Sequence, residues 1–238
     1  MNMESGDQQI MPPLQSVSAQ ISDRLRHMIL VGELPPGQQV TQEGLAAKLG
    51  VSTMPIREAL LKLSHEGFIE VRRSRSFRVS HTTREDVADI YWLHAKLAGE
   101  LTSRACHGID DATLKELESF HHRWNKIALQ GRPEILEAMN WTFHRRINHA
   151  AHAPKLLLIL RQTTRMIPEH FYTLVPGWAS MSAHGHREIL DALHARDSEM
   201  ARKAAEQHVL DAGKLLIVYF DDMGFWKNPA ESSNNVKM

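Results

Sequence analysis

The sequence has very little cysteine, no long hydrophobic run and no excess of either charge. Its single cysteine, Cys106, excludes an internal disulfide framework. The longest aliphatic runs, Leu156 to Leu160 and Leu215 to Val218, are far shorter than the roughly 20 residues that a membrane-spanning helix needs. Because the N-terminus also lacks the basic-then-apolar layout of a signal peptide, we expect a cytoplasmic protein without a membrane segment.

The charge balance is even overall but uneven along the chain. Lys and Arg number 28 and Asp and Glu number 28, so composition alone gives no reason to expect a nucleic-acid partner. Four arginines nevertheless fall between residues 72 and 78. A local cluster of that kind neutralises phosphates whatever the total charge. With 238 residues and 42% hydrophobic content, the chain is long enough for one or two domains, each with its own core.

Composition and periodicity divide the chain into four parts. Residues 1–14 are polar with two prolines and are typical of a flexible arm. Residues 15–80 combine short helical and strand patterns, whereas residues 81–225 are helical in period except where the loop residues TLVPGWAS break the pattern. Residues 226–238 have the composition of a disordered tail. We therefore expect a mainly α protein, with a small mixed N-terminal domain followed by an all-α helical bundle.

The mixed domain ends in two short helices and a hairpin. Thr41 is placed to cap the first of these helices, and Ser52 to cap the second, which ends at Gly67. The β-branched and aromatic runs FIEV (68–71) and FRV (77–79) flank the polar segment RRSRS and read as a hairpin. Two helices at a glycine-containing turn, followed by a basic hairpin, are typical of a winged helix-turn-helix.

In a winged helix-turn-helix the second helix enters the major groove, and its first residues meet the base edges. The apolar stripe of this helix leaves Thr53, Met54 and Arg57 facing outward. An arginine there contacts a guanine or a phosphate, although a solvated helix arginine is the commoner case when the residue is taken alone. The candidate DNA-binding residues are Thr53, Met54, Arg57, Arg72, Arg73 and Arg75.

The stretch LAAKLGVSTMPIREALLKLSHEGFIEV resembles the DNA-binding domain of the GntR family, which has LGVS, PVREAL and EG at this spacing. The resemblance covers about residues 17 to 80 and implies binding to a double-stranded DNA operator. Arg57 matches an arginine that the family retains. Thr53 and Met54 stand where the family usually has Arg and Thr, and Ser74 stands where the wing tip is usually Gly, so the operator sequence does not carry over. A palindromic operator is bound by two DNA-binding domains related by twofold symmetry, and we therefore expect a homodimer.

Six helices are expected after His81. Thr83 and Asp86 have the spacing of a capping box at the start of the first, Asp110 caps the second, and Pro133 opens the third. The third helix is expected to end near residue 151, and the last three are expected at about 154–172, 181–195 and 198–223.

The chain has 15 histidines, most of which show no pattern typical of a metal site. Asn140 and His144 are four residues apart and share a helix face, while His186 and His208 lie on two later helices. If the three imidazoles face inward, they suit a divalent transition metal such as Zn, Ni, Fe or Mn. From spacing alone, core histidines with hydrogen-bonded rings are the commoner outcome.

Residues 84 to 223 resemble the FCD ligand-binding domain of the FadR subfamily, in its six-helix, VanR-like form. The family motif D-x-x-F-H appears as Asn140 to His144, its H-x-x-I-L begins at His186, and His208 matches the last ligand. The resemblance implies that these four residues hold a metal, which in turn helps to hold a small organic acid. Asn140 replaces the family's Asp, and a neutral amide oxygen is a weaker metal ligand than a carboxylate.

The same resemblance implies an acid-binding pocket inside the bundle. His94 and Ala98 stand where RxxLE-type residues are common in the family, so we expect His94 to face the pocket. Arg161 and Arg165 on the fourth helix are candidates for contacts with the acid. The ordinary alternative for His94 is a buried polar contact. For the two arginines it is exposure to solvent.

Together these features predict a ligand-responsive transcriptional regulator, acting as a repressor that leaves a palindromic operator when the acid binds. The alternative is a metal-dependent enzyme acting on a small carboxylate. Against it, HExxH is absent because His65 and Glu66 are followed by Gly67, Phe68 and Ile69, and the sequence has no GxSxG motif or Gly-rich phosphate loop. We therefore expect no enzyme. A metal-sensing regulator without an organic ligand is a third reading.

Overall fold

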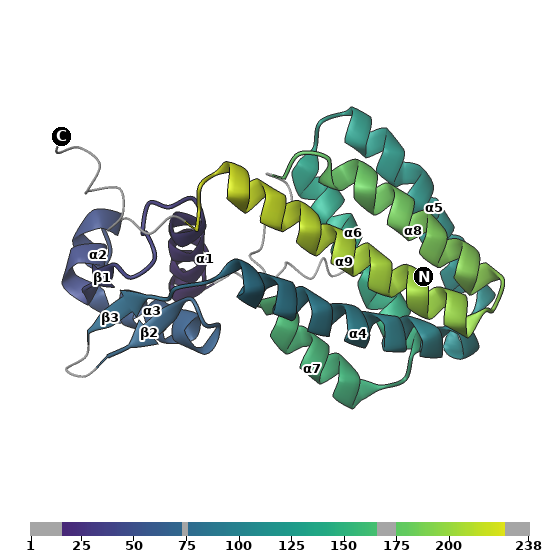
Figure 1. Cartoon of the computed structure of the whole chain (residues 1–238), viewed down its shortest axis with the longest axis horizontal. Coiled ribbons are helices and arrows are strands. Elements are labelled where there is room, and N and C mark those ends of the chain that lie inside the picture. The colour runs from purple at the N-terminus through teal and green to yellow at the C-terminus, as the bar shows by residue number, and fades with distance from the viewer. Residues whose placement is uncertain (1–15, 73–75, 166–174, 227–238) are drawn as a thin grey trace, which may run out of the picture.

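The computed structural model describes residues 16–72, 76–165 and 175–226, without the side chains of Pro133 and Arg165. It has a small helical and strand-containing part and a larger bundle of long helices, shown at the left and right of Figure 1. The predicted arm and nearly all of the predicted tail lie outside the described residues. No helix among the described residues is long and apolar enough to cross a membrane.

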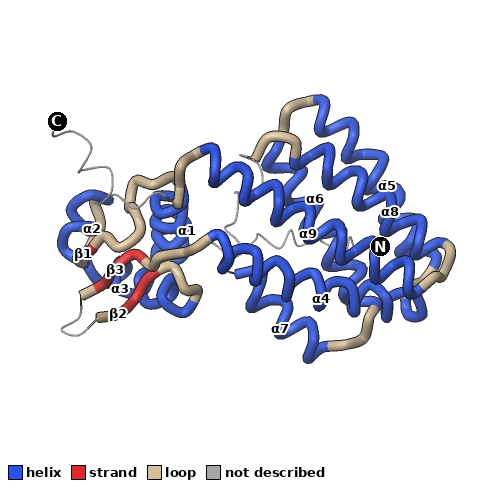
Figure 2. The backbone as a smooth tube through the Cα atoms, in the orientation of Figure 1, coloured by secondary structure: helices blue, strands red, loops and turns tan. Residues whose placement is uncertain are grey.

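The N-terminal part contains three helices and a three-stranded antiparallel sheet. The strands are ordered β1-β3-β2, with Val71 opposite Phe77 in the hairpin and Val40 opposite Phe77 on the other side (Figure 2). The hairpin is confirmed, but strand β1 was not predicted, because a two-residue strand is too short to show an alternating pattern. The elements are α1 (Val17–Leu30), β1 (Gln39–Val40), α2 (Gln42–Leu49), α3 (Thr53–His65), β2 (Ile69–Val71) and β3 (Phe77–Val79).

Helix α3 buries one face, begins directly after Ser52 as predicted, and ends at His65, two residues before the predicted stop at Gly67. Its apolar stripe is fully buried and packs against α1 and α2. Gly67, which follows the C-cap residue Glu66, has φ +84°, a left-handed conformation that favours glycine. Ser52 occupies the N-cap position, but its side chain accepts no hydrogen bond from the helix. Thr41, in contrast, accepts a hydrogen bond from the amide of Gly44 at 3.1 Å and caps α2 as expected.

A buried ion pair joins the first helix to the end of the third. Arg26 Nη2 donates to Glu66 Oε2 at 2.5 Å and Arg26 Nη1 to Asp23 Oδ1 at 2.7 Å, and the side chains of Arg26 and Glu66 are only 6% and 8% exposed. The two bonded carboxylates balance the charge of a guanidinium that burial would otherwise penalise, although Arg26 Nε has no hydrogen-bond partner among the described residues. The pair fixes the relative position of α1 and α3.

Within the described residues, the C-terminal part is a bundle of six helices. The predicted capping box is present, because Thr83 accepts a hydrogen bond from the Asp86 amide and Asp86 accepts one from the Thr83 amide. The fifth helix begins at Trp178, three residues before the prediction, and residues 166–172 of the predicted fourth helix lie outside the described residues. The helices are α4 (Arg84–Gly108), α5 (Asp111–Leu129), α6 (Pro133–Ala150), α7 (Pro154–Arg165), α8 (Trp178–His194) and α9 (Ser198–Asp222).

Helices α4 and α9 lie side by side and run in opposite directions, and one end of this pair meets the N-terminal part (Figure 1). Glycines allow the close approach. A Cβ on Gly99 would lie 2.5 Å from Glu206 Cγ, and one on Gly213 would lie 2.6 Å from Tyr91 Cγ. Such distances leave no space for any larger residue. The α4–α9 pair therefore forms a rigid connection from the interior of the bundle to the junction with α1–α3.

Candidate nucleic-acid interface and metal centre

The first turn of α3 presents the side chains that were predicted to meet DNA. Thr53, Met54 and Arg57 are all exposed, and Met54 retains 66% of its accessible surface. A single exposed methionine is common on a protein surface, but at this position it gives the start of the helix an apolar contact surface. The uncapped amides of this turn and the guanidinium of Arg57 give the same surface a positive potential, which suits a phosphate.

Of the three hairpin arginines that were predicted to contact DNA, Arg72 is the one within the described residues. Arg72 is exposed, and its Nη2 donates to Glu70 Oε2 at 2.6 Å, so part of its charge is already balanced. Arg73 and Arg75, the other two predicted contacts, lie outside the described residues, as does Ser74.

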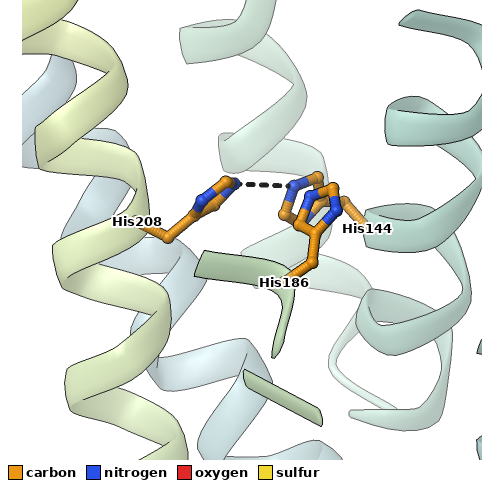
Figure 3. A group of neighbouring side chains, drawn as sticks. All are labelled: His144, His186 and His208. Carbon is orange, nitrogen blue, oxygen red and sulfur yellow. Dashed lines mark hydrogen bonds between the residues drawn. The ribbon is translucent and has the colours of Figure 1, made fainter. Parts of the chain in front are cut away.

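Three histidines from three helices meet inside the bundle. His144 lies on α6, His186 on α8 and His208 on α9, and one ring nitrogen of each falls within 4.8 Å of the others (Figure 3). The Nε2 atoms of His144 and His208 are 3.2 Å apart. The structure thus brings together the three imidazoles that the sequence could place only on separate helices.

Neighbouring residues set the orientation of these rings. Phe143 stacks on His186 with ring centroids 4.1 Å apart, and Trp124 meets the same imidazole edge-on at 5.1 Å. Gly185 provides the space for His208, since a Cβ there would lie 2.3 Å from His208 Nδ1. None of these three supporting roles was predicted from the sequence, although a glycine next to His186 in the middle of a helix was a usable signal.

Burial keeps the three imidazoles neutral at neutral pH. Desolvation, with a smaller effect of His208, lowers the pKa of His144 to about 3, and desolvation, with a smaller effect of His94, lowers that of His208 to about 4. Burial likewise holds the pKa of His186 well below its ordinary value. A metal binds the neutral imidazole, and neither His186 Nε2 nor His208 Nδ1 has a hydrogen-bond partner among the described residues. These features fit a divalent transition metal.

Asn140, the fourth predicted ligand, lies one turn before His144 on α6. Its side chain is buried, and its Oδ1 has no hydrogen-bond partner among the described residues. Asn140, His144 and His208 line the same cavity. A buried carbonyl oxygen without a donor is costly, and a cation is one way to satisfy it.

This cavity, of about 320 Å³, lies between α4, α6, α7 and α9. Its size suits a small organic molecule. Apolar residues form much of its wall, including Tyr91, Leu160 and Trp178, while Thr164 and Asn148 add polar groups. Asn148, four residues after His144 on the same helix face, also lines the cavity and was not predicted from the sequence.

The predicted acid-binding residues occupy different positions. His94 lines the cavity, with Nδ1 3.4 Å from Thr163 Oγ1, and desolvation followed by the proximity of His144 lowers its pKa to about 4. Arg161 is largely exposed but lines the cavity, and Arg145 lines it as well although it was not predicted. Arg165 is the last residue of α7, and its side chain lies outside the described part of the chain.

Comparisons with known proteins agree with this arrangement. Residues 17–79 match the gntR family of bacterial regulatory proteins, and residues 89–211, more than half of the chain, match the FCD domain. A probable D-xylose utilization operon transcriptional repressor from Paenarthrobacter nicotinovorans is 29% identical over 201 residues, covering 82% of this chain and 86% of that protein. The HTH-type transcriptional regulator McbR of Escherichia coli K12 is 26% identical over 191 residues, covering 79% of this chain and 86% of that protein.

Solved structures show the same fold. The structure described as E. coli McbR/YncC superposes with a TM-score of 0.64 at 23% identity, and the match covers 87% of this chain and all 100% of that one. Relatives and family matches are transcriptional regulators, which supports a regulator over the enzyme alternative. The chain therefore belongs to the GntR family of bacterial regulatory proteins, in the group that carries an FCD domain, and is a ligand-responsive, DNA-binding transcriptional regulator and not an enzyme.

Proposed function

We propose that the protein is a cytoplasmic repressor that binds a palindromic operator as a homodimer and leaves it when a small organic acid binds beside a divalent metal. Residues 15–80 form the DNA-binding domain in this proposal, and residues 81–225 form the metal-binding, acid-binding and dimerisation domain. The observation that carries the proposal is the convergence of His144, His186 and His208 inside a bundle attached to the N-terminal domain, with His144 and His208 lining a cavity there.

DNA contact is assigned to the first turn of α3 and to the hairpin. Thr53, Met54 and Arg57 read the major groove, where Arg57 contacts a guanine or a phosphate and Met54 offers an apolar surface to a thymine methyl. Arg72, Arg73 and Arg75 contact the backbone. Supporting this assignment, the opposite face of α3 is buried and unavailable, whereas these first-turn side chains are exposed.

Metal binding is assigned to His144, His186, His208 and Asn140. The metal is Zn, Ni, Fe or Mn, because imidazole suits all four of these ions. When bound, it supplies a Lewis-acidic position for an oxygen of the acid. His94 and Arg161 face the acid from the other walls, and Arg165 is assigned to the same end of α7.

Dimerisation is assigned to the outer faces of α4 and α7. Trp92 and Leu93 on α4 are 57% and 42% exposed, and Leu158 and Ile159 on α7 are 52% and 48% exposed. The two helices pack against each other, so these residues belong to neighbouring surfaces. Large exposed apolar side chains on adjacent helices mark a surface that a partner covers.

Tyr91 gives the effector site a route to the DNA-binding domain. It lines the acid cavity and also a second cavity of about 300 Å³, whose wall includes Ile29 and Phe68 from the N-terminal part and Phe220 from α9. A ligand that displaces Tyr91 therefore changes the packing at the junction between the two domains. A ligand shifts the equilibrium between the operator-bound and released conformations only if its contacts differ between them. We assign that difference to Tyr91, because it lines both cavities.

The test is operator release. Operator fragments are selected from genomic DNA with the purified protein, and small organic acids are then screened for release in the presence of metal. A variant with Ala in place of His144, His186 and His208 should bind the fragment as tightly as wild type but should not release it. The proposal is wrong if the triple variant responds to the same acid at the same concentration as wild type does.

The rival is a regulator that senses the metal without an organic ligand. It predicts that metal alone releases the operator and that acids add nothing, so the same screen separates the two. The cavity beside the histidines favours the proposal, because a site that senses only a metal needs no cavity of about 320 Å³ next to it.

A further inference from the structure

A second cavity, of about 300 Å³, lies where the N-terminal part meets the bundle. Its wall combines residues of α1 and of the turn after α3 with residues of α4 and α9, and Figure 1 shows these elements meeting at one end of the α4–α9 pair. The wall is mostly apolar, and its buried side chains, each no more than 8% exposed, include Ile29, Phe68, Val87, Leu216 and Phe220. A cavity of this size and character suits the apolar body of a small molecule.

This cavity at the domain junction is separate from the one beside the histidines. Among the described residues, Tyr91 alone lines both cavities, and the second is lined by none of His144, His186, His208 and Asn140. A molecule bound at the junction therefore needs no metal.

Glu66 gives the junction cavity a buried negative charge. Its side chain lines the wall and is 8% exposed, and its Oε2 accepts the hydrogen bond from Arg26, whereas its Oε1 has no hydrogen-bond partner among the described residues. Arg26 also donates to Asp23, so two carboxylates share one guanidinium. This group therefore has one negative charge in excess, and one carboxylate oxygen remains available to a donor.

Three helices end at the same cavity. Leu30 is the last residue of α1, Glu66 is the C-cap of α3, and Phe225 follows the end of α9, and all three residues line the wall. The last carbonyl groups of a helix have a partial negative charge, which favours a cation within about one turn of the helix end. The three helix ends therefore act in the same direction as the carboxylate of Glu66.

The remaining charged groups of the wall do not oppose this preference. Helix α4 begins here with the opposite polarity, but its first turns contribute the exposed carboxylates of Asp86 and Asp89. None of the described residues that line the cavity is Lys or Arg. Exposed carboxylates are screened by solvent, so the buried Glu66 has the larger effect. The cavity thus favours a ligand with a positive group over one with a carboxylate.

We propose that the cavity at the domain junction is a second effector site, which binds a small apolar amine. The apolar body of the amine packs against the buried side chains, and its ammonium group donates to Glu66. Because the ligand contacts both parts of the molecule, its binding favours one arrangement of the DNA-binding domain on the bundle and changes operator affinity. The inference depends neither on the proposed metal site nor on the proposed acid site.

The experiment is calorimetric titration of the full-length protein with 2-phenylethylamine and with 2-phenylethanol at neutral pH. The two probes share an aromatic body and differ in the charge of the donor group. A chelator in the buffer removes any metal. We expect the amine to bind at least about tenfold more tightly than the alcohol, because a hydrogen bond between charged groups is stronger than one with a neutral donor. Equal affinities overturn the role of the negative charge, and absence of amine binding overturns the site.

Variants locate the binding site. Thr82→Trp places an indole in the cavity from a half-buried position of its wall, so amine binding should be lost. Ile90→Trp, from a half-buried position on α4, gives the same test if circular dichroism shows that Thr82→Trp does not fold. Ser180→Trp, at an exposed position of α8 outside both cavities, is the matched control and should bind the amine as wild type does. Wild-type amine affinity in a folded Thr82→Trp or Ile90→Trp protein contradicts the proposal.

Glu66→Gln tests the origin of the preference for the amine. It removes the negative charge and keeps the shape of the side chain, so amine affinity should fall to that of the alcohol while alcohol affinity stays unchanged. A folded Glu66→Gln protein that still prefers the amine by the wild-type factor excludes Glu66 as the partner of the ammonium group.

The regulatory consequence is measured on the operator fragment. Saturating 2-phenylethylamine should change the operator affinity of the metal-free wild type at least about fivefold, the lower end of the usual coupling between two ligands. Ser180→Trp should respond as wild type does, and the operator affinity of Thr82→Trp should not depend on the amine. Unchanged operator affinity in wild type saturated with the amine overturns the role of the cavity as an effector site. Release of the operator by an organic acid is a separate measurement, so its failure does not affect this result.

Discussion

Gly185 on α8 lies directly against the imidazole of His208 on α9. A Cβ at Gly185 would fall 2.3 Å from His208 Nδ1 and 2.9 Å from its Cγ, so any larger residue must displace the ring. The position of one of the three converging histidines therefore depends on a glycine that binds nothing itself.

Gly185→Ala should weaken metal binding by about 10- to 100-fold, as expected when the support of a ligand is lost. Overpacking should also lower the free energy of unfolding by about 1–3 kcal/mol. Equilibrium dialysis with Zn²⁺ and urea unfolding measure the two effects. Ser180→Ala, at an exposed position of the same helix, is the control for alanine in α8. Wild-type metal affinity in a folded Gly185→Ala protein would show that His208 is not a ligand.

Glu66→Ala should lower the free energy of unfolding by about 3–5 kcal/mol, because it leaves the buried Arg26 guanidinium with Asp23 as its one remaining carboxylate. The exposed pair between Arg24 and Glu33, at 3.8 Å, provides the contrast. Glu33→Ala should change stability by less than about 1 kcal/mol. Urea unfolding of the two variants measures this difference, and equal effects would mean that burial of the Arg26 pair is unimportant.

Acid should weaken the contact between α5 and α8. Arg187 donates to both oxygens of Glu118, at 2.8 and 2.9 Å, and these bonds, opposed by partial burial and assisted by His194, hold the pKa of Glu118 below its ordinary value. The pair's contribution is therefore present above the unfolded pKa of about 4.3 and is lost as pH falls through the lower folded value.

Glu118→Gln should accordingly be less stable than wild type by up to about 1 kcal/mol at neutral pH, and the difference should vanish in acid. Thermal unfolding between neutral and acidic pH, with Glu188→Gln on the exposed side of α8 as control, follows this change. A gap between Glu118→Gln and wild type that widens as pH falls would have the wrong sign for this explanation.

Tyr91→Leu should separate acid binding from operator release. The variant retains all four proposed metal ligands, so metal affinity should stay within about threefold of wild type, whereas the acid-induced change in operator affinity should fall by about 0.5–2 kcal/mol. Metal titration and operator release from the same preparation give both values. A full response to the acid would exclude Tyr91 as the connection between the two cavities.

Local signals in the sequence were sufficient for most of the fold. The capping box of Thr83 and Asp86 and the side-chain caps of Thr41 and Asp110 depend on contacts three residues apart, so their spacing predicts them directly. Strand β1 was missed because its pairing with β3 joins Val40 to Phe77, a long-range contact that leaves no periodic pattern in two residues.

The candidate site was also predictable only where it depends on local spacing. The sequence placed His144, His186 and His208 on separate helices, but only the crossing of α6, α8 and α9 shows that their rings meet. Asn148 shares a helix face with His144, so helical periodicity could have predicted that it lines the same cavity. The position of Arg145 could not be predicted in this way, because it is one residue after His144 in α6 and lines the cavity through the arrangement of the helices.

The role of α3 as the DNA-reading helix is tested most directly by the affinity of an operator fragment for Arg57→Ala. Fluorescence anisotropy at several salt concentrations, with the exposed arginine variant Arg24→Ala as control, gives the affinity and its salt dependence. Arg57→Ala should lose about 1–3 kcal/mol of binding free energy, whereas Arg24→Ala should bind like wild type. Unchanged affinity and salt dependence for a folded Arg57→Ala protein would contradict the assignment of α3 as the helix that reads DNA.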